Sequence, residues 1–142
     1  KMKKILIINA NYYNDITLKL LNTSKKILKR NKYNLNLITV TGAFEIPVTI
    51  KKYINKYDAF LALGCVIKGK TPHFDLICKS TFNSISLLSI TYSKPIGNGI
   101  ITAINIKQAK ERCGIIKSGK PNKGAEAANA VLSILKNGPK KI

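Results

Sequence analysis

The only histidine of the chain, His73, lies beside residues that could bind an anion. Histidine is the one side chain whose unperturbed pKa lies near neutrality, so His73 is a natural candidate for proton transfer. It belongs to Thr71-Pro72-His73, which lies between an apolar run and a stretch of helical periodicity. Lys70 and Thr71 could hold an anion at the start of that helix. An ordinary surface or core histidine is the alternative interpretation.

A carboxylate and two aromatic rings follow other apolar runs of the chain. Glu45 ends the segment Gly42-Ala43-Phe44-Glu45, and Tyr12 and Tyr13 come after the first apolar run. Glu45 could project toward His73, or it could be a carboxylate favoured by the dipole of a helix N-terminus. The two tyrosines could stack on a planar ligand or cover the edge of a sheet.

Two cations complete the set of candidate functional residues. Arg112 is one of only two arginines, and its planar guanidinium fits a phosphate, although a cation also suits a helix C-terminus. Lys123 stands near a predicted helix start, and a solvated loop lysine is the alternative.

The segment from Gly64 to Thr71 matches the phosphate-loop pattern G-x-x-x-x-G-K-T and is predicted to follow a strand. Val66 and Ile67 are β-branched and suit a tight cradle of backbone N–H groups poorly. Pro72 removes an N–H where the helix of such a loop should begin. No predicted strand ends in an aspartate placed to hold magnesium. A P-loop nucleotide-binding enzyme therefore remains an alternative function rather than the preferred one.

The net charge of +19 raises the question of nucleic-acid binding. The 23 lysines are spread from end to end, and Arg30 and Arg112 are the only arginines. Because Lys, Ile and Asn are all abundant and have A/T-rich codons, we attribute the charge mainly to genome composition. A basic RNA-binding module is kept as a second alternative.

Cysteine usage and hydropathy restrict the class of protein further. Three widely spaced cysteines form neither a disulfide framework nor a C-x-x-C pair, which favours a reducing cytoplasm. With one histidine and six carboxylates, a metal site is hard to assemble. No apolar run approaches the roughly 18 residues of a membrane span, and the first residues do not resemble a secretory signal. We expect no membrane partner.

Short β-branched runs alternate with stretches of helical periodicity, which predicts an α/β fold with a parallel sheet. The predicted strands span Lys4–Ile8, Leu35–Val40, Ala59–Leu63 and Ile100–Ala103. The predicted helices span Ile16–Arg30, a segment from about Pro47 to Asn55, Phe74–Tyr92, Ile106–Arg112 and Ala125–Leu135. We expect one domain over residues 1–142, with three layers, four parallel strands, and ligands beyond the carboxyl ends of the strands.

Four groups of residues resemble the lumazine synthase family in order and spacing. They are Gly42–Pro47, Leu63–Gly69 with Thr71–Asp75, Gln108–Arg112, and Asn122–Gly124 with Glu126–Ala128. The resemblance implies a flavodoxin-like fold and the penultimate step of riboflavin synthesis. In that step 5-amino-6-ribitylaminouracil and 3,4-dihydroxy-2-butanone 4-phosphate give 6,7-dimethyl-8-ribityllumazine, phosphate and water. No metal or organic cofactor is implied.

The resemblance also implies a role for each candidate residue. His73 matches the proton-transfer residue, and Lys70, Thr71 and Arg112 match the residues that bind the butanone phosphate. The pyrimidine and its ribityl chain would be bound by Tyr12, Ala43, Phe44, Glu45, Cys65, Val66, Ile67 and Lys123. Asn98 occupies the place of an aromatic that usually reaches a neighbouring subunit's site, so this wall of the site departs from the family pattern.

The family assembles as a free pentamer or as a shell of twelve pentamers, with active sites between adjacent subunits. Here seven residues, Ile115–Pro121, lie where many relatives have four, and the chain begins almost directly at its first strand. Both features, together with the high charge, lead us to expect a homopentamer. Riboflavin synthase is a candidate partner, and no nucleic-acid partner is expected.

Overall fold

Four parallel strands form one sheet in the order β2-β1-β3-β4. They are β1 (Lys4–Ala10), β2 (Asn34–Val40), β3 (Ala59–Ile67) and β4 (Ile96–Ala103). The computed structural model describes residues 2–142, so Lys1 of the expected domain lies outside the described residues. In β1 every residue from Ile5 to Ala10 is buried, as expected for a central parallel strand covered on both faces.

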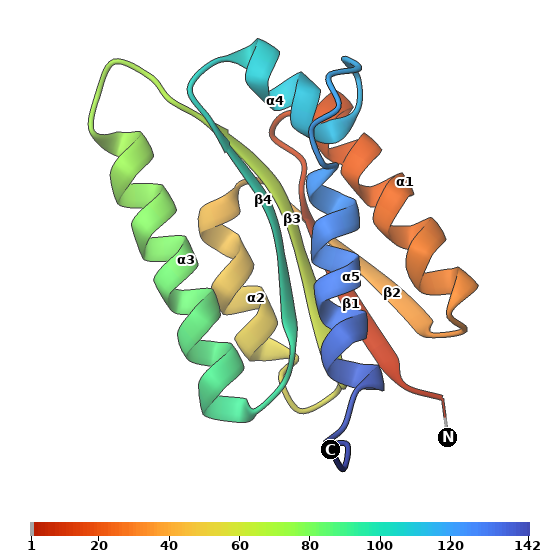
Figure 1. The fold of residues 1–142 in the computed structure, drawn as a ribbon. Helices are drawn as coiled ribbons and strands as arrows, with labels where there is room; N and C mark the ends of the chain where they lie inside the picture. The colour runs from red at the N-terminus through yellow and green to blue at the C-terminus, as the bar shows by residue number, and fades with distance from the viewer. Residues whose placement is uncertain (1) are drawn as a thin grey trace.

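Helices cover both faces of this sheet (Figure 1). One core contains residues of α1 (Asn14–Arg30), α4 (Ile106–Cys113) and α5 (Lys123–Lys136). The other contains residues of a short 3₁₀ turn, η1 (Ala43–Glu45), α2 (Ile46–Lys52) and α3 (His73–Tyr92). The predicted three-layer α/β/α architecture with a four-stranded parallel sheet is therefore confirmed.

All nine predicted strands and helices are present, and most of their ends lie within two residues of the predicted positions. The exceptions are corrections to the sequence analysis. β3 continues through Ile67 instead of ending at Leu63, β4 begins at Ile96 instead of Ile100, and α2 ends at Lys52 instead of Asn55. Gly97 and Gly99 lie in the missed part of β4, where their low β-propensity leaves only a weak local signal for a strand.

Close packing of α5 on β4 explains why glycine occurs inside that strand. A Cβ atom built on Gly97 would lie 2.5 Å from the backbone oxygen of Ala127 in α5. The missing side chain lets the helix backbone approach the strand directly. This contact sets the position of α5, whose first turn carries Lys123.

Hydrogen bonds fix the turns that precede α4 and α5. Asn105 caps α4, because its Oδ1 accepts the backbone N–H of Gln108 at 2.8 Å. α4 ends at Cys113, and the C-cap Gly114 has a φ of 86°, a left-handed conformation that glycine adopts without strain. Asn122 then caps α5, with its Oδ1 accepting the N–H of Ala125 at 3.0 Å. Within residues 2–142, no helix is both long enough and apolar enough to cross a membrane.

Candidate active site

A cavity of about 510 Å³ lies at the carboxyl ends of β1, β2 and β3. This is where the strand order reverses, since β2 lies on one side of β1 and β3 lies on the other. Ligands of open α/β sheets bind at such a point. The cavity is lined by Tyr12, Tyr13, Thr41, Gly42, Ala43, Phe44, Glu45, Cys65, Val66, Ile67, His73 and Ile77. The fold thus brings eight of the predicted site residues together.

Aromatic rings at this cavity are unusually open to solvent. Tyr12 is 72% exposed and Phe44 is 56% exposed. Tyr13 supports Tyr12 edge-on, with ring centroids 5.0 Å apart and an interplanar angle of 79°. An exposed ring held by a neighbour can stack on a planar ligand at little cost in conformational entropy.

Glu45 and His73 are held by local hydrogen bonds. The Glu45 Oε1 atom accepts the backbone N–H of Gly42 at 3.0 Å, which fixes the carboxylate at the end of η1. The backbone N–H of His73 contacts the Thr71 Oγ1 atom at 3.4 Å. His73 is the first residue of α3, and its side chain is exposed. The histidine can therefore exchange protons with bound molecules and with water.

The end of β3 presents backbone groups that lack a strand partner on one side. In the described part of the chain, β1 pairs with β3 only as far as Leu63, whereas β4 pairs with it through Ile67. Cys65, Val66 and Ile67 thus extend past β1 with one backbone edge facing the cavity side of the sheet. A buried peptide edge needs hydrogen-bond partners, and a planar ligand with alternating donors and acceptors can supply them.

Cys65 lines the cavity but is not suited to nucleophilic chemistry. Burial, with smaller contributions from Cys113 and Asp15, raises the pKa of its thiol to about 12. The thiol therefore stays protonated at physiological pH, and only the thiolate is a strong nucleophile. Its contribution to the site is its backbone and its shape.

The phosphate-loop match is corrected by the length of β3. We predicted that Gly64–Thr71 follows a strand, but Gly64 to Ile67 are themselves in β3 and pair with Ile100 to Ala103. Four of the residues that would wrap a nucleotide phosphate are therefore extended. The basis for a P-loop nucleotide-binding enzyme is lost.

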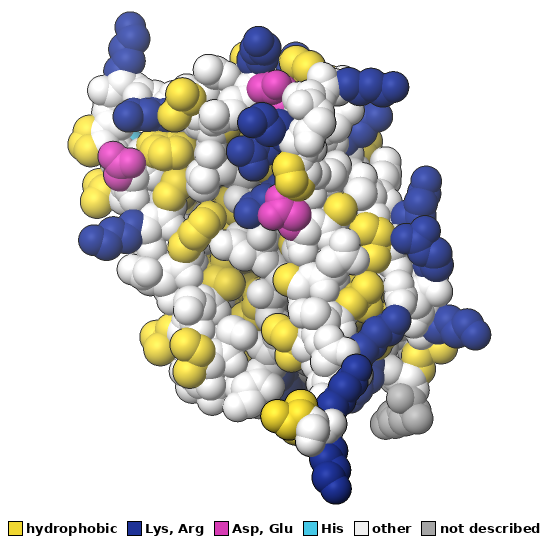
Figure 2. Space-filling model, viewed as in Figure 1, with side chains coloured by type: hydrophobic (Ala, Val, Ile, Leu, Met, Phe, Trp, Pro, Cys, Tyr) yellow, Lys and Arg dark blue, Asp and Glu magenta, His cyan; other side chains and the backbone are white. Residues whose placement is uncertain are grey.

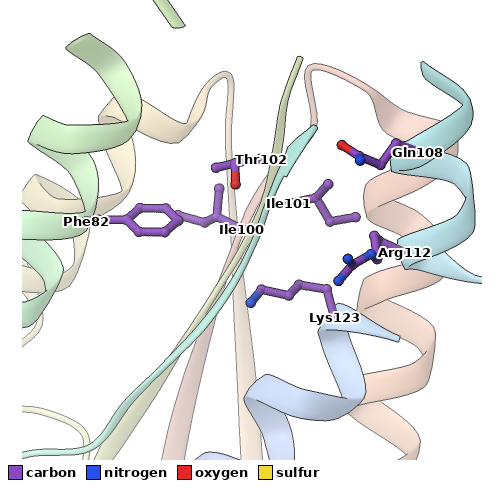
Figure 3. Close-up of a pocket in the computed structure, with 7 residues that line it drawn as sticks. All are labelled: Phe82, Ile100, Ile101, Thr102, Gln108, Arg112 and Lys123. Atoms are coloured by element: carbon purple, nitrogen blue, oxygen red, sulfur yellow. The ribbon is translucent and has the colours of Figure 1, made fainter. Parts of the chain in front are cut away.

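Arg112 and Lys123 line a second cavity, of about 250 Å³, beside the edge strand β4 (Figure 3). Phe82 of α3 lines it as well. Figure 3 shows Gln108 and Arg112 projecting from α4 toward the strand, while Lys123 reaches in from the start of α5. None of the described residues that line this cavity is acidic, and it shares no lining residue with the larger one. Two cations in a cavity whose described lining residues include no carboxylate form a suitable site for an anion.

One asparagine ties together the two helices that carry these cations. Asn122 donates a side-chain N–H to the backbone oxygen of Cys113 at 3.0 Å, and it also caps α5. The end of α4 and the start of α5 are thereby fixed to each other. Lys123 is a half-buried residue in the first turn of α5, so its interpretation as a solvated loop lysine is wrong.

Three predicted site residues line neither of these cavities. Lys70 and Thr71 lie exposed between β3 and α3, next to His73. Asn98 lies within β4, where its Oδ1 accepts the backbone N–H of Ile100 at 3.1 Å.

Several lining residues were not predicted as site residues, and helix geometry could have found two of them. Ile77 follows His73 by one helical turn in α3, and Gln108 precedes Arg112 by one turn in α4. Residues four apart share a helix face, so each of these could have been inferred from its partner. Thr102 had no comparable signal.

Basic side chains are dispersed over the face that Figure 2 shows, and they do not gather into one stripe. Nucleic-acid-binding domains concentrate such charge along one surface. The distribution gives the RNA-binding alternative no support on that face.

Comparison with known proteins agrees with this architecture. The family model described as 6,7-dimethyl-8-ribityllumazine synthase matches residues 2–137. Proteins of that name are similar to this chain, with 41% identity in Aliarcobacter butzleri (94% of this chain and 86% of the relative) and 42% in Campylobacter jejuni subsp. doylei (93% and 87%). A protein of the same name from a Sulfurovum species is 41% identical, over 95% of this chain and 88% of the relative. The chain belongs to the 6,7-dimethyl-8-ribityllumazine synthase family.

Proposed function

We propose that the protein is a transferase that condenses 5-amino-6-ribitylaminouracil with 3,4-dihydroxy-2-butanone 4-phosphate. The products are 6,7-dimethyl-8-ribityllumazine, phosphate and water, and the reaction is the penultimate step of riboflavin biosynthesis. Membership of the family supports this function. The observation that carries it is the unpaired backbone edge of β3, which lies in one cavity with exposed aromatic rings and the only histidine.

The larger cavity binds the pyrimidine in this proposal. Tyr12 stacks on the ring, and the backbone of Cys65, Val66 and Ile67 forms hydrogen bonds with its polar edge. Ala43, Phe44 and Glu45 line the ribityl chain and the ring. A uracil alternates carbonyl and N–H groups along one edge, and the free edge of a β-strand offers the complementary pattern.

His73 transfers protons between the reactants. An aryl amine must attack a ketone, water and phosphate must leave, and a ring must close, so protons move at several steps. One exposed imidazole at the cavity can accept and return them. Most of the acceleration then comes from holding the two substrates together.

The phosphate is bound by cations from two copies of the chain. Lys70 and Thr71 stand beside His73, whereas Arg112 and Lys123 line a cavity that shares no residue with that of His73. We therefore place Arg112, Lys123 and Asn98 of one copy against the larger cavity of its neighbour. There Arg112 offsets the charge of the departing phosphate, while Lys123 and Asn98 approach the pyrimidine.

The remaining proposals concern the whole protein. We propose that residues 1–142 form a single domain, that five copies assemble into a ring, and that the enzyme works in the cytoplasm. Cys65, Cys78 and Cys113 are all free thiols, which suits a reducing compartment. Riboflavin synthase, which uses the lumazine product, is a candidate partner.

The direct test is incubation of the purified protein with both substrates, followed by measurement of lumazine absorbance. We expect product only when both substrates are present. A ribityl-pyrimidine analogue should also raise the melting temperature, while ATP with magnesium should not. Absence of product together with stabilisation by ATP would contradict the proposal.

The shared site has its own test, in which two impaired variants are unfolded and refolded as a mixture. His73→Ala and Arg112→Ala should each have little activity alone when the butanone phosphate is kept well below the raised Michaelis constant of Arg112→Ala. Random mixing into rings should restore about a quarter of the sites, because a quarter of the interfaces combine an intact histidine with an intact arginine. No gain in activity on mixing would place both residues in a site within one chain.

A further inference from the structure

Gln108 is the one side chain of the smaller cavity with an uncharged amide, and its carbonyl end is already engaged. The backbone N–H of Ile104 donates to Gln108 Oε1 at 2.9 Å, across the turn that joins β4 to α4. The backbone N–H of Gln108 in turn donates to Asn105 Oδ1 at 2.8 Å. The first bond fixes the direction of the Gln108 side chain, and the second caps the start of α4.

The orientation of the amide follows from the first of these bonds. With Oε1 held by the turn, the Nε2 group is the free end of the side chain, and no partner for it is found within residues 2–142. Gln108 is half-buried and lines the cavity together with Thr102, Arg112 and Lys123. Figure 3 shows its amide on the same side of α4 as the Arg112 guanidinium.

An unused donor beside two cations suits a ligand that only accepts hydrogen bonds. An amide N–H₂ has two protons to donate, and leaving them without a partner when a ligand excludes water costs free energy. A phosphate offers several acceptor oxygens, more than one guanidinium can engage through two parallel bonds.

We propose that Gln108 is a phosphate-binding residue: its carbonyl secures the turn after β4 while its N–H₂ group donates to an oxygen of the phosphate that Arg112 holds. This inference rests on the proposed function, because the butanone phosphate supplies the anion. It adds an uncharged donor of fixed direction to the cations, and so favours a phosphate oxygen at one position in the cavity.

A capping role alone would also explain the two hydrogen bonds, so the test needs a variant that weakens the turn without removing the donor. Asn105→Ala is that variant, because it breaks the other cap of α4 and leaves the Gln108 amide in place. Gln108→Met removes the donor and keeps the length and volume of the side chain.

The experiment measures Michaelis constants for both substrates and the rise in melting temperature produced by inorganic phosphate, using the full chain in its assembled form. We expect Gln108→Met to raise the Michaelis constant for the butanone phosphate about tenfold and to reduce the stabilisation by phosphate. The constant for the pyrimidine should change less than about twofold. Asn105→Ala should lower the melting temperature and leave both readouts of phosphate binding near wild type.

Two results would overturn the inference. One is a Gln108→Met enzyme with an unchanged Michaelis constant for the butanone phosphate and unchanged stabilisation by phosphate. The other is an Asn105→Ala enzyme whose phosphate binding is weakened as much as that of Gln108→Met. If Gln108→Met does not fold, Gln108→Glu keeps an acceptor for the Ile104 N–H and places a negative charge in the cavity, so phosphate binding should be lost. A wild-type protein that binds phosphate but forms no lumazine would refute the proposed function. The role of Gln108 would then be tested only by the rise in melting temperature that inorganic phosphate produces.

Discussion

Cys65 and His73 both line the larger cavity, and they differ in how far they are buried. Burial keeps the Cys65 thiol protonated by raising its pKa to about 12, whereas His73 stands exposed at the start of α3. A protonated thiol is a poor nucleophile and a poor base at neutral pH. Of these two side chains, the histidine is therefore the one that we propose for proton transfer.

Replacement of His73 by alanine should lower turnover far more than it weakens the binding of either substrate. Loss of a general acid or base typically costs about 10²- to 10⁴-fold in rate. The variant should still hold the two substrates together, so some acceleration should remain. Steady-state kinetics with each substrate varied in turn provide the measurement. Turnover within about twofold of wild type would exclude a role for His73 in proton transfer.

Replacement of Arg112 by alanine should raise the Michaelis constant for the butanone phosphate selectively. The substitution removes a charge-assisted contact to phosphate that the pyrimidine does not use. Competition by inorganic phosphate should weaken in parallel. If both substrates bind more weakly by the same factor, the arginine acts instead as a cation at the end of α4, where it suits the helix dipole.

At the scale of elements, the difference in length between β1 and β3 makes the site. β3 continues to Ile67 beside β4, but its pairing with β1 ends at Leu63. The chain leaves β1 for α1 at that point, so the tyrosines after β1 and the η1 turn after β2 border the unpaired backbone edge of β3. The cavity therefore forms where β3 extends beyond the end of β1.

The contact between β4 and α5 supports the second cavity, so Gly97→Ala should destabilise the protein. Its new Cβ would lie 2.5 Å from the Ala127 oxygen and 2.8 Å from the Val131 Cγ2 atom. Overpacking of this kind typically costs about 1 to 3 kcal/mol, measurable by urea unfolding. Gly138→Ala is a matched control, because its Cβ would meet nothing within 4 Å. Equal stability of the two variants would show that α5 can move away freely.

At the scale of the whole molecule, the high net charge and the separation of the two cavities have opposite consequences for assembly. The separation of Arg112 and Lys123 from His73 favours a ring in which neighbours complete each other's sites. A net charge of +19 on every copy opposes the packing of rings against one another, unless anions or salt screen it.

We predict a free pentamer on these grounds, with the segment Ile115–Pro121 as a further obstacle to shell formation. This segment joins α4 to α5, is mostly exposed, and contains Gly119 in a left-handed conformation with a φ of 72°. Pro121 stiffens it directly before the cap of α5. Light scattering in near-physiological salt should give the mass of five chains, and a particle of about sixty chains would refute the prediction.

The sequence by itself determined the class of fold, and it predicted eight of the residues that line the larger cavity. Apolar runs such as Ile5–Ile8 and the helical periodicity of α1 are local patterns, and burial of those patterns permits few arrangements beyond a covered parallel sheet. The segments around Glu45 and His73 follow strands, so their meeting at one sheet edge was predictable from strand direction alone.

Only the tertiary structure decided the strand ends, the division of the site and the protonation of Cys65. Whether Val66 and Ile67 form a phosphate loop or a strand depends on their partners Thr102 and Ala103, which lie far along the sequence. The 2.5 Å approach at Gly97 depends likewise on α5. Arg112 and His73 lie in separate cavities, and the pKa of Cys65 is raised mainly by burial. Each of these is a property of contacts between distant segments, which local sequence does not encode.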